Sequence, residues 1–508
     1  MMSDSVVIGI DGGTTAVKAV GFDLHGGVIA LAHRSIPVQY GSNGEAEQDA
    51  HAIWEGVAEC LRDVTAELGD RQILSVGLTG QGDGCWLFDR DIEPLGPVPN
   101  WMDGRAAHRV PSWEADHRGA ALAETTGGAP FPGLAPVLLE HLKETDPEAY
   151  GRAEHLLYCK DWLRYRLTGN VSTDYTEASR NFLDVRTTGG YSEELAERLG
   201  MPEALKLVPD ILQADALGGH VTAAASSQTG IPESTPVGVG MMDVAVTGVG
   251  LQATKNGDGW MILGTTGFIG RLSESMDQRE SSASTILATG RGTQVIESMA
   301  PMTGTPNLDW IRRTIGLEDM SWPDIEVLAS ESGPGAGGVI YLPYASPGGE
   351  RAPFLDPSAS SSWLGMNLST TPNHMLRAVY EGVAFSLAEC IDALNMTGRL
   401  VVSGGGFRSD LICQVLADTT GQEVVRQDAP EAGARGAAVL ALVSAGIEED
   451  LESAARRLAT GTDTFAPNAS NHSIYQQAYR VFVNARKAIR PVWPEMRELR
   501  ANTGVSEK

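Results

Sequence analysis

The chain has 508 residues, enough for two or more domains with complete hydrophobic cores. It carries 65 acidic and 38 basic residues, a formal net charge of −27, and such a surface repels nucleic-acid phosphates and anionic membranes. The five cysteines are far apart, odd in number and without a Cys-x-x-Cys pair, which favours the reducing cytoplasm over a disulfide framework. The start of the chain lacks a basic signal-peptide pattern, and no run of about 20 apolar residues predicts a membrane span.

A glycine- and threonine-rich turn lies near the start of the chain, between two predicted buried strands at residues 6–10 and 17–22. Glycines let the backbone turn sharply and present several N–H groups to one side, and the threonine hydroxyls add donors. This turn consists of Gly12, Gly13, Thr14 and Thr15, and Asp11 directly precedes it. We interpret residues 12–15, the first turn, as a cradle for a polyphosphate, with Asp11 placed to hold a hydrated metal ion. An ordinary hairpin with a Gly-rich turn is the alternative.

A second copy of this pattern occurs in the other half of the chain. Gly264, Thr265 and Thr266, the second turn, again separate two apolar strands, at residues 260–263 and 267–272. Two such turns predict two similar domains that face each other across a nucleotide. The chain contains no Gly-Lys-Ser/Thr run and no Gly-x-Gly-x-x-Gly before a helix at this position, which argues against a Walker loop and a dinucleotide site.

A predicted helix at residues 49–68 is followed by a predicted buried strand at 73–79. Gln81 and Asp83 come directly after this strand. In an open α/β sheet, ligands bind at the carboxyl ends of strands, and amide and carboxylate groups match sugar hydroxyls. These two side chains are therefore candidate hydroxyl ligands, with a solvated Gly-rich turn as the alternative.

Two further polar segments are candidates for the substrate side. Asp103 and Arg105 follow Trp101 in a loop, where the indole would stack on a sugar face and the charged pair would form an ion pair. A surface loop with a salt bridge explains the same residues. Asp174 lies in a polar cluster at residues 172–179, near a predicted turn.

Asp243 is a solitary carboxylate in the apolar, Gly-rich segment 235–250. A buried carboxylate without a partner is costly, so it needs either a partner or a purpose. Burial raises the pKa of a carboxyl group, which suits a general base. The alternative is a helix N-cap, for a helix that begins near Val244.

The second half continues after a predicted linker at residues 250–258. Gly304 precedes a predicted helix and would let a nucleotide approach the backbone. A predicted strand at 400–403 runs into Gly405 and Gly406, whose backbone would pack against adenine and ribose. Residues 372–394 predict a long amphipathic helix, and the small residues at 431–438 predict a tightly packed core helix.

From residue 6 to residue 482 the chain resembles the FGGY carbohydrate kinases of the actin-like ATPase superfamily. Residues 361–366 and then, seven residues later, 374–381 are similar to the C-terminal signature of that family. The resemblance implies an α/β fold of two ribonuclease H-like domains, at residues 1–250 and 251–490, with a cleft for nucleotide and substrate between them.

The resemblance also implies an ATP-dependent kinase that uses Mg²⁺ near Asp11, with Asp243 as the catalytic base. The nucleotide side would consist of Asp11, Gly12, Gly13, Thr14, Thr15, Lys18, Gly264, Thr265, Thr266, Gly304, Gly405 and Gly406. The substrate side would consist of Gln81, Asp83, Asp103, Arg105, Asp174 and Asp243.

Within the family, the runs at residues 79–87, 159–163, 173–179 and 307–311 are most similar to erythritol kinases. Glycerol kinases carry Arg-Glu where this chain has Gly82-Asp83. We therefore expect phosphorylation of a terminal hydroxyl of a small polyol, with erythritol as the first choice. A D-xylulose or L-xylulose kinase is the alternative, and an actin-like ATPase switch without a sugar substrate is the alternative from another class. The oligomeric state stays open, with a homodimer among the arrangements.

Overall fold

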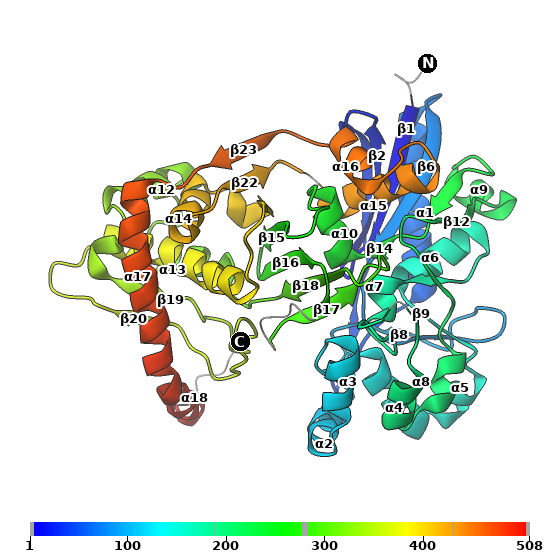
Figure 1. The fold of residues 1–508 in the computed structure, drawn as a ribbon, viewed down its shortest axis with the longest axis horizontal. Helices are drawn as coiled ribbons and strands as arrows, with labels where there is room; N and C mark the ends of the chain where they lie inside the picture. The colour runs from blue at the N-terminus through cyan, green and yellow to red at the C-terminus, as the bar shows by residue number, and fades with distance from the viewer. Residues whose placement is uncertain (1–4, 188, 277–282, 430, 504–508) are drawn as a thin grey trace.

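The computed structural model describes residues 5–187, 189–276, 283–429 and 431–503. Two seven-stranded sheets form the centres of two α/β domains, one from each half of the chain (Figure 1). Within the described residues, no helix combines the length and the hydropathy that a membrane crossing requires.

The first sheet has the strand order β12-β13-β6-β1-β2-β3, and β14 also pairs with β6. β1, β2 and β3 form an antiparallel meander, whereas β6 runs parallel to β1, and β13 and β14 run parallel to β6. The strands are β1 (Ser5–Gly12), β2 (Ala16–Asp23), β3 (Val28–Ser35), β6 (Gln72–Gly80), β12 (Leu217–His220), β13 (Pro236–Gly238) and β14 (Met241–Met242).

The second sheet has the order β17-β18-β16-β15-β21-β22-β23. β15 is antiparallel to β16 and parallel to β21, just as β1 is antiparallel to β2 and parallel to β6. The strands are β15 (Gly259–Leu263), β16 (Gly267–Ser273), β17 (Thr285–Ala288), β18 (Val295–Met299), β21 (Leu400–Ser403), β22 (Val424–Gln427) and β23 (Thr462–Phe465). The two Gly-Thr-Thr turns therefore occupy equivalent positions, and the predicted α/β fold of two similar domains is confirmed.

Each sheet is covered by an amphipathic helix that the sequence predicts. α1 (Ala50–Leu68) buries its apolar stripe against the first sheet. Asp49 is its N-cap, and the Asp49 side chain accepts hydrogen bonds from the backbone N–H groups of His51 and Ala52. α13 (Pro372–Ala393) is buried along most of its length in the second domain and begins with a capping box between Thr371 and His374. These helices fix the two sheets as separate layered cores.

Two helices join the domains. α10 (Asp243–Gly250) follows β14, and α15 (Ala432–Ser444) returns from the second half of the chain to pack on β1 and β6 (Figure 1). A Cβ atom at Gly9 would lie 1.9 Å from the carbonyl oxygen of Ala434, and one at Gly436 would lie 2.0 Å from that of Val246. Only glycine allows backbones to approach this closely, so small residues bring α15 against both the first sheet and α10.

This return of the chain bears on the proposed domain division. Residues 1–250 and 251–490 each supply one complete sheet. α15, however, lies in the second segment and packs on the sheet of the first, and α16 (Leu451–Arg457) packs beside α15 and α10. The division at residue 250 thus separates the two sheets. The assignment of α15 and α16 to the second domain stays a proposal.

Candidate active site

Three neighbouring strands of the first sheet end at the same edge. Gly12, the last residue of β1, pairs with Gly80 of β6, and Gly80 also pairs with Met242 of β14. Because these strands run parallel, their next residues project from one edge of the sheet. The register therefore brings together the first turn, Gln81 and Asp243.

Asp243 is the first residue of α10, and its half-buried side chain accepts a hydrogen bond of 2.7 Å from the backbone N–H of Val244. Met242 holds the N-cap position, so the alternative that Asp243 caps this helix is not supported. Burial raises the pKa of the Asp243 carboxyl to about 7, and the nearby carboxylates of Asp11 and Asp83 raise it further. A carboxyl group that titrates near neutral pH is suited to accept a proton from a hydroxyl.

The two strands that flank the first turn carry a second carboxylate, Asp11, and a cation, Lys18. Burial raises the pKa of Asp11 to about 6, with Lys18 opposing the shift and Glu431 adding to it. Lys18 on β2 pairs with Asp11 on β1. The ammonium nitrogen of Lys18 lies 2.6 Å from a carboxylate oxygen of Glu431, directly before α15. Glu431, which the sequence analysis did not single out, thus links β2, the strand after the first turn, to the helix that returns from the second domain.

The first turn also contacts two residues from outside the sheet. The indole N–H of Trp101 donates to the Thr14 hydroxyl at 2.9 Å, and the side-chain amide of Gln48 donates to the Thr14 carbonyl at 2.8 Å. Gln48 ends β5 (Ala46–Gln48), a short strand before α1. Its position in an ordinary polar stretch gave no signal in the sequence.

The predicted nucleotide residues of the second half converge at the ends of β15 and β21. The backbone N–H of Thr305, at the start of α11 (Pro306–Thr314), donates to the Gly264 carbonyl at 2.8 Å. A Cβ atom at Gly304 would lie 2.1 Å from the carbonyl oxygen of Thr265, and the Gly405 position opens on free space. Gly406 packs its backbone on the last residue of β15, and Thr265 and Thr266 are exposed. The second turn therefore has bare, accessible backbone.

On the predicted substrate side, Gln81 is buried, and its side chain donates to that of Gln48 at 2.7 Å. Asp83 has the left-handed backbone angle φ of 58°, and its carboxylate accepts a hydrogen bond of 2.8 Å from the guanidinium of Arg180. A strained residue in a polar edge position is typical of functional sites. Arg180 was not predicted, although it follows the polar cluster at residues 172–179.

Asp103 and Arg105 form the expected ion pair, at 2.8 Å. Asp103 is 1 % exposed, and its carboxylate also accepts from the backbone N–H of Ala46. Arg105 pairs in addition with Glu47 at 2.5 Å. The pair therefore anchors the loop of Trp101 to β5, and its contact with a substrate stays a prediction.

Asp174 is wholly buried, 2.8 Å from the ammonium group of Lys160, and its other oxygen caps α7 (Tyr175–Ala178) through Thr176. The Thr176 hydroxyl accepts in turn from the backbone N–H of Met242. Thr176 thus links Asp174 to Met242, the residue directly before Asp243. The role of Asp174 as a substrate ligand stays a prediction. Glu177, on the same short helix, is a buried carboxyl without a hydrogen-bond partner among the described residues, and burial raises its pKa strongly.

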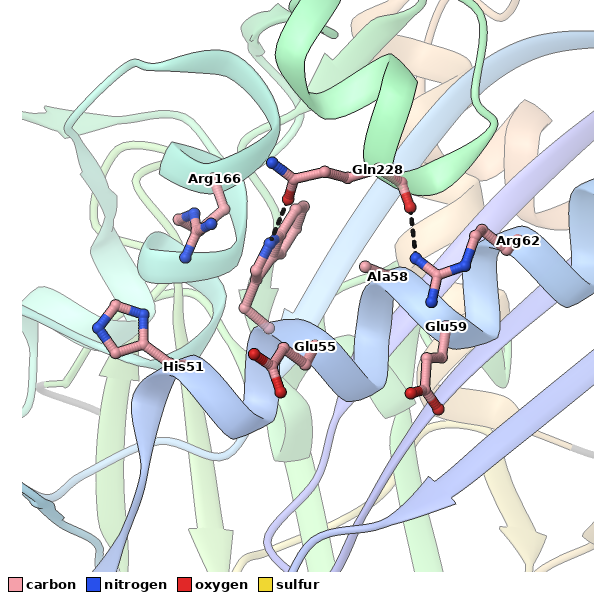
Figure 2. Close-up of a pocket in the computed structure, with 8 residues that line it drawn as sticks. His51, Glu55, Ala58, Glu59, Arg62, Arg166 and Gln228 are labelled. Atoms are coloured by element: carbon pink, nitrogen blue, oxygen red, sulfur yellow. Dashed lines mark hydrogen bonds between the residues drawn. The ribbon is translucent and has the colours of Figure 1, made fainter.

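A hollow of about 380 Å³ lies elsewhere, between α1, α6 (Cys159–Thr168) and α9 (Ala223–Thr229) (Figure 2). In this hollow the indole N–H of Trp54 donates to Gln228 at 2.8 Å, and the guanidinium of Arg166 stacks over the Trp54 ring. None of the predicted site residues lines it. The candidate active site is therefore the sheet edge at Asp243 rather than this hollow.

Comparisons with known proteins show which family the chain resembles. Residues 6–250 match the N-terminal domain of the FGGY family of carbohydrate kinases, and residues 259–445 match its C-terminal domain. The chain is 31 % identical to an erythritol kinase of Brucella abortus, over 97 % of this chain and 98 % of the relative. It is 26 % identical to a probable L-xylulose kinase of Haemophilus influenzae, over 95 % and 99 %. The crystal structure of a gluconate kinase from Lactobacillus acidophilus superposes with a TM-score of 0.89 at 25 % identity, over 97 % and 99 %.

Proposed function

Because this chain belongs to the FGGY family of carbohydrate kinases and is an ATP-dependent carbohydrate or polyol kinase, we propose that its substrate is a small polyol, with erythritol as the first choice. The observation that carries this choice is the full-length similarity to the erythritol kinase of Brucella abortus. The Asp83–Arg180 pair beside Gln81 supports it, because this polar arrangement offers both donors and acceptors to vicinal hydroxyl groups.

In the proposed reaction, Asp243 accepts the proton of the terminal hydroxyl group. The hydroxyl oxygen forms a bond to the γ-phosphorus of ATP, and the bond from that phosphorus to the bridging oxygen breaks, which releases ADP. The pKa of about 7 keeps much of the Asp243 population ionised at neutral pH while leaving the carboxylate basic enough to accept a proton. Backbone N–H groups of the two turns would bind the phosphate oxygens, so that positioning and electrostatics supply most of the catalysis.

Asp11 is the residue that would hold Mg²⁺. Burial and the negative charge of Glu431 raise the pKa of the Asp11 carboxyl, so a cation beside it would be stabilised. Magnesium in phosphate-transfer sites takes one or two carboxylates and fills its remaining positions with water and phosphate oxygens, and this donor set fits that pattern. The chemistry that the ion supplies is neutralisation of the phosphate charge.

A ketopentose kinase is the second candidate function, because relatives named as xylulose and L-xylulose kinases match at 24–27 % identity over nearly the whole chain. The family assignment argues against the ATPase switch without a sugar substrate.

A substrate panel tests the proposal. The purified protein would be offered erythritol, the threitols, glycerol, D-xylulose, L-xylulose and ribulose in an assay that couples ADP release to NADH oxidation. We expect the highest kcat/KM with erythritol, and the Asp243→Asn variant serves as the control for contaminating kinases. A higher kcat/KM with a ketopentose would replace erythritol with the second candidate, and ATP hydrolysis that no acceptor stimulates would overturn both.

We also propose the cytoplasm as the location, since all five cysteines are buried and unpaired, as expected for a reducing compartment. A homodimer stays a hypothesis, and light scattering on the eluted protein would test it by molar mass.

A further inference from the structure

Two buried side-chain amides connect the end of β6 to the first turn. Gln81 is 2 % exposed, and its Nε2 group donates to Oε1 of Gln48 at 2.7 Å. Gln48 is wholly buried, and its own Nε2 group donates to the Thr14 carbonyl at 2.8 Å. Gln48, Gln81 and Thr14 thus form a continuous hydrogen-bonded chain, which we call the amide relay.

The chemistry at one end of the amide relay fixes its direction. The Thr14 carbonyl can only accept, so Gln48 must present its NH₂ group to Thr14 and its oxygen to Gln81. Gln81 must then present its own NH₂ group to Gln48, which leaves its Oε1 atom at the free end. That oxygen is buried and has no hydrogen-bond partner among the described residues.

The free oxygen belongs to the residue directly after β6, where the backbone register brings the ends of β1 and β14 together. Gln81 directly follows Gly80, which pairs on one side with the end of β1 and on the other with Met242, the residue before Asp243. A buried acceptor without a hydrogen bond is unfavourable, so a donor is needed there. A polyol offers O–H donors, and one of its hydroxyl groups must approach Asp243 for the proposed reaction.

We propose that Oε1 of Gln81 accepts a hydrogen bond from a substrate hydroxyl group, and that Gln48 is a positioning residue that transmits this contact to Thr14 in the first turn. The proposal rests on the proposed function. Hydrogen bonds in a chain polarise one another, so an occupied Gln81 strengthens the bond that holds the Thr14 carbonyl. The indole N–H of Trp101, in the substrate-side loop, donates to the hydroxyl oxygen of Thr14. The Thr14 hydroxyl can therefore still donate its own hydrogen to a phosphate oxygen.

The consequence is positive coupling between the acceptor and the nucleotide. Acceptor binding orders the first turn, and nucleotide binding then requires less ordering. Such coupling is reciprocal and amounts to roughly 5–150-fold in affinity in typical cases. Gln48 touches neither ligand in this arrangement, so its replacement should remove the coupling and leave acceptor binding nearly intact.

The test is calorimetric titration of the full chain with Mg²⁺ and a non-hydrolysable ATP analogue, with and without the acceptor that the substrate panel identifies. In the wild type we expect the acceptor to tighten nucleotide binding at least about fivefold. In Gln48→Met, which keeps the length of the side chain and removes its amide, we expect a ratio near one. Gln39→Met, an exposed change on the neighbouring strand β4 (Gln39–Tyr40), is the matched control and should keep the wild-type ratio.

A second variant covers the case in which Gln48→Met fails to fold. Gln48→Glu keeps the acceptor for Gln81, and its carboxyl group can donate to the Thr14 carbonyl only when protonated. The coupling should therefore be present at acidic pH and lost as the pH rises, a dependence that the wild type should not show. Three results would overturn the proposed role of the amide relay. They are a wild type without coupling, equal coupling in the wild type and in Gln48→Met, and coupling in Gln48→Glu that does not depend on pH. A wild type that phosphorylates none of the panel would instead overturn the proposed function.

Discussion

Replacement of Asp243 by asparagine should slow catalysis and at the same time stabilise the free protein. Asparagine has nearly the same shape but cannot accept a proton, and removal of a general base costs about 10²–10⁴-fold in rate. We expect kcat to fall by this factor while the KM for ATP changes little. In the wild type, kcat/KM for the acceptor should fall as the pH drops below about 7, because Asp243 must be ionised to act as a base.

The stabilisation follows from the raised pKa. The Asp243 carboxyl titrates near 7 in the folded protein, against its ordinary value of 3.8. Between these values the folded state holds a proton that the unfolded chain releases, so stability falls as the pH rises through this window. At pH 8 the ionised carboxylate costs at most about 4 kcal/mol, and less because the side chain is only half-buried. Asparagine stays neutral and avoids this cost.

The assay compares thermal unfolding of the two proteins without ligand. Asp243→Asn should melt at a higher temperature than the wild type at pH 8 and at the same temperature at pH 4. Asp70→Asn, the same chemical change at an exposed position after α1, should alter neither kcat nor the melting temperature. An unchanged kcat would refute the role as a base, and equal melting temperatures at pH 8 would refute the raised pKa.

Three glycine substitutions give further predictions. Gly304→Ala would place a Cβ atom 2.1 Å from the Thr265 carbonyl and displace the second turn, so the KM for ATP should rise about 5- to 100-fold with little change in the KM for the acceptor. Gly9→Ala would place a Cβ atom 1.9 Å from the Ala434 carbonyl, so it should destabilise the protein by about 1–3 kcal/mol or more, measured by urea unfolding. Gly151→Ala, on α5 (Pro147–Arg152) with nothing within 4 Å, should be neutral or slightly stabilising by the same measurements.

The strands and turns could be predicted because their signal is local. An apolar run, a Gly-Thr-Thr turn and a second apolar run predict a hairpin, and both copies in this chain form one. Asp243 was prominent for a similar reason, since it is a single charge in an apolar segment. The strand ends then placed Gln81 beside it, because parallel strands align their carboxyl ends.

The contacts that complete the site could not be predicted, because they join distant parts of the chain. Lys18 and Glu431 are separated by 413 positions, and Asp83 and Arg180 by 97. Nothing in the local sequence of either partner names the other. Gln48 was missed for the same reason, since its two hydrogen bonds depend on where a three-residue strand lies.

Carboxylates that hold the backbone are a second limit of sequence reasoning. Asp103 looked like a substrate ligand, and its oxygens accept from Ala46 and Arg105. Asp174 looked similar, and its oxygens contact Lys160 and cap a helix. A polar residue in a loop has the same sequence signature whether it contacts a ligand, its own chain or both, so the substrate contacts of Asp103 and Asp174 stay predictions.

The packing of α10 and α15 determines which parts of the site can move together. α10 begins at Asp243, and its backbone touches that of α15 at Gly250 and Gly436, while α15 touches the first sheet at Gly9. Since backbone atoms are already in contact, these helices cannot slide on each other or on the sheet without collision. The helix that begins at Asp243 and the strand β1 that leads into the first turn therefore form one rigid unit, and any closure of the domains must bring the second turn towards this unit. The nucleotide would then be carried to a base whose position is already fixed, which is the arrangement that in-line phosphoryl transfer requires.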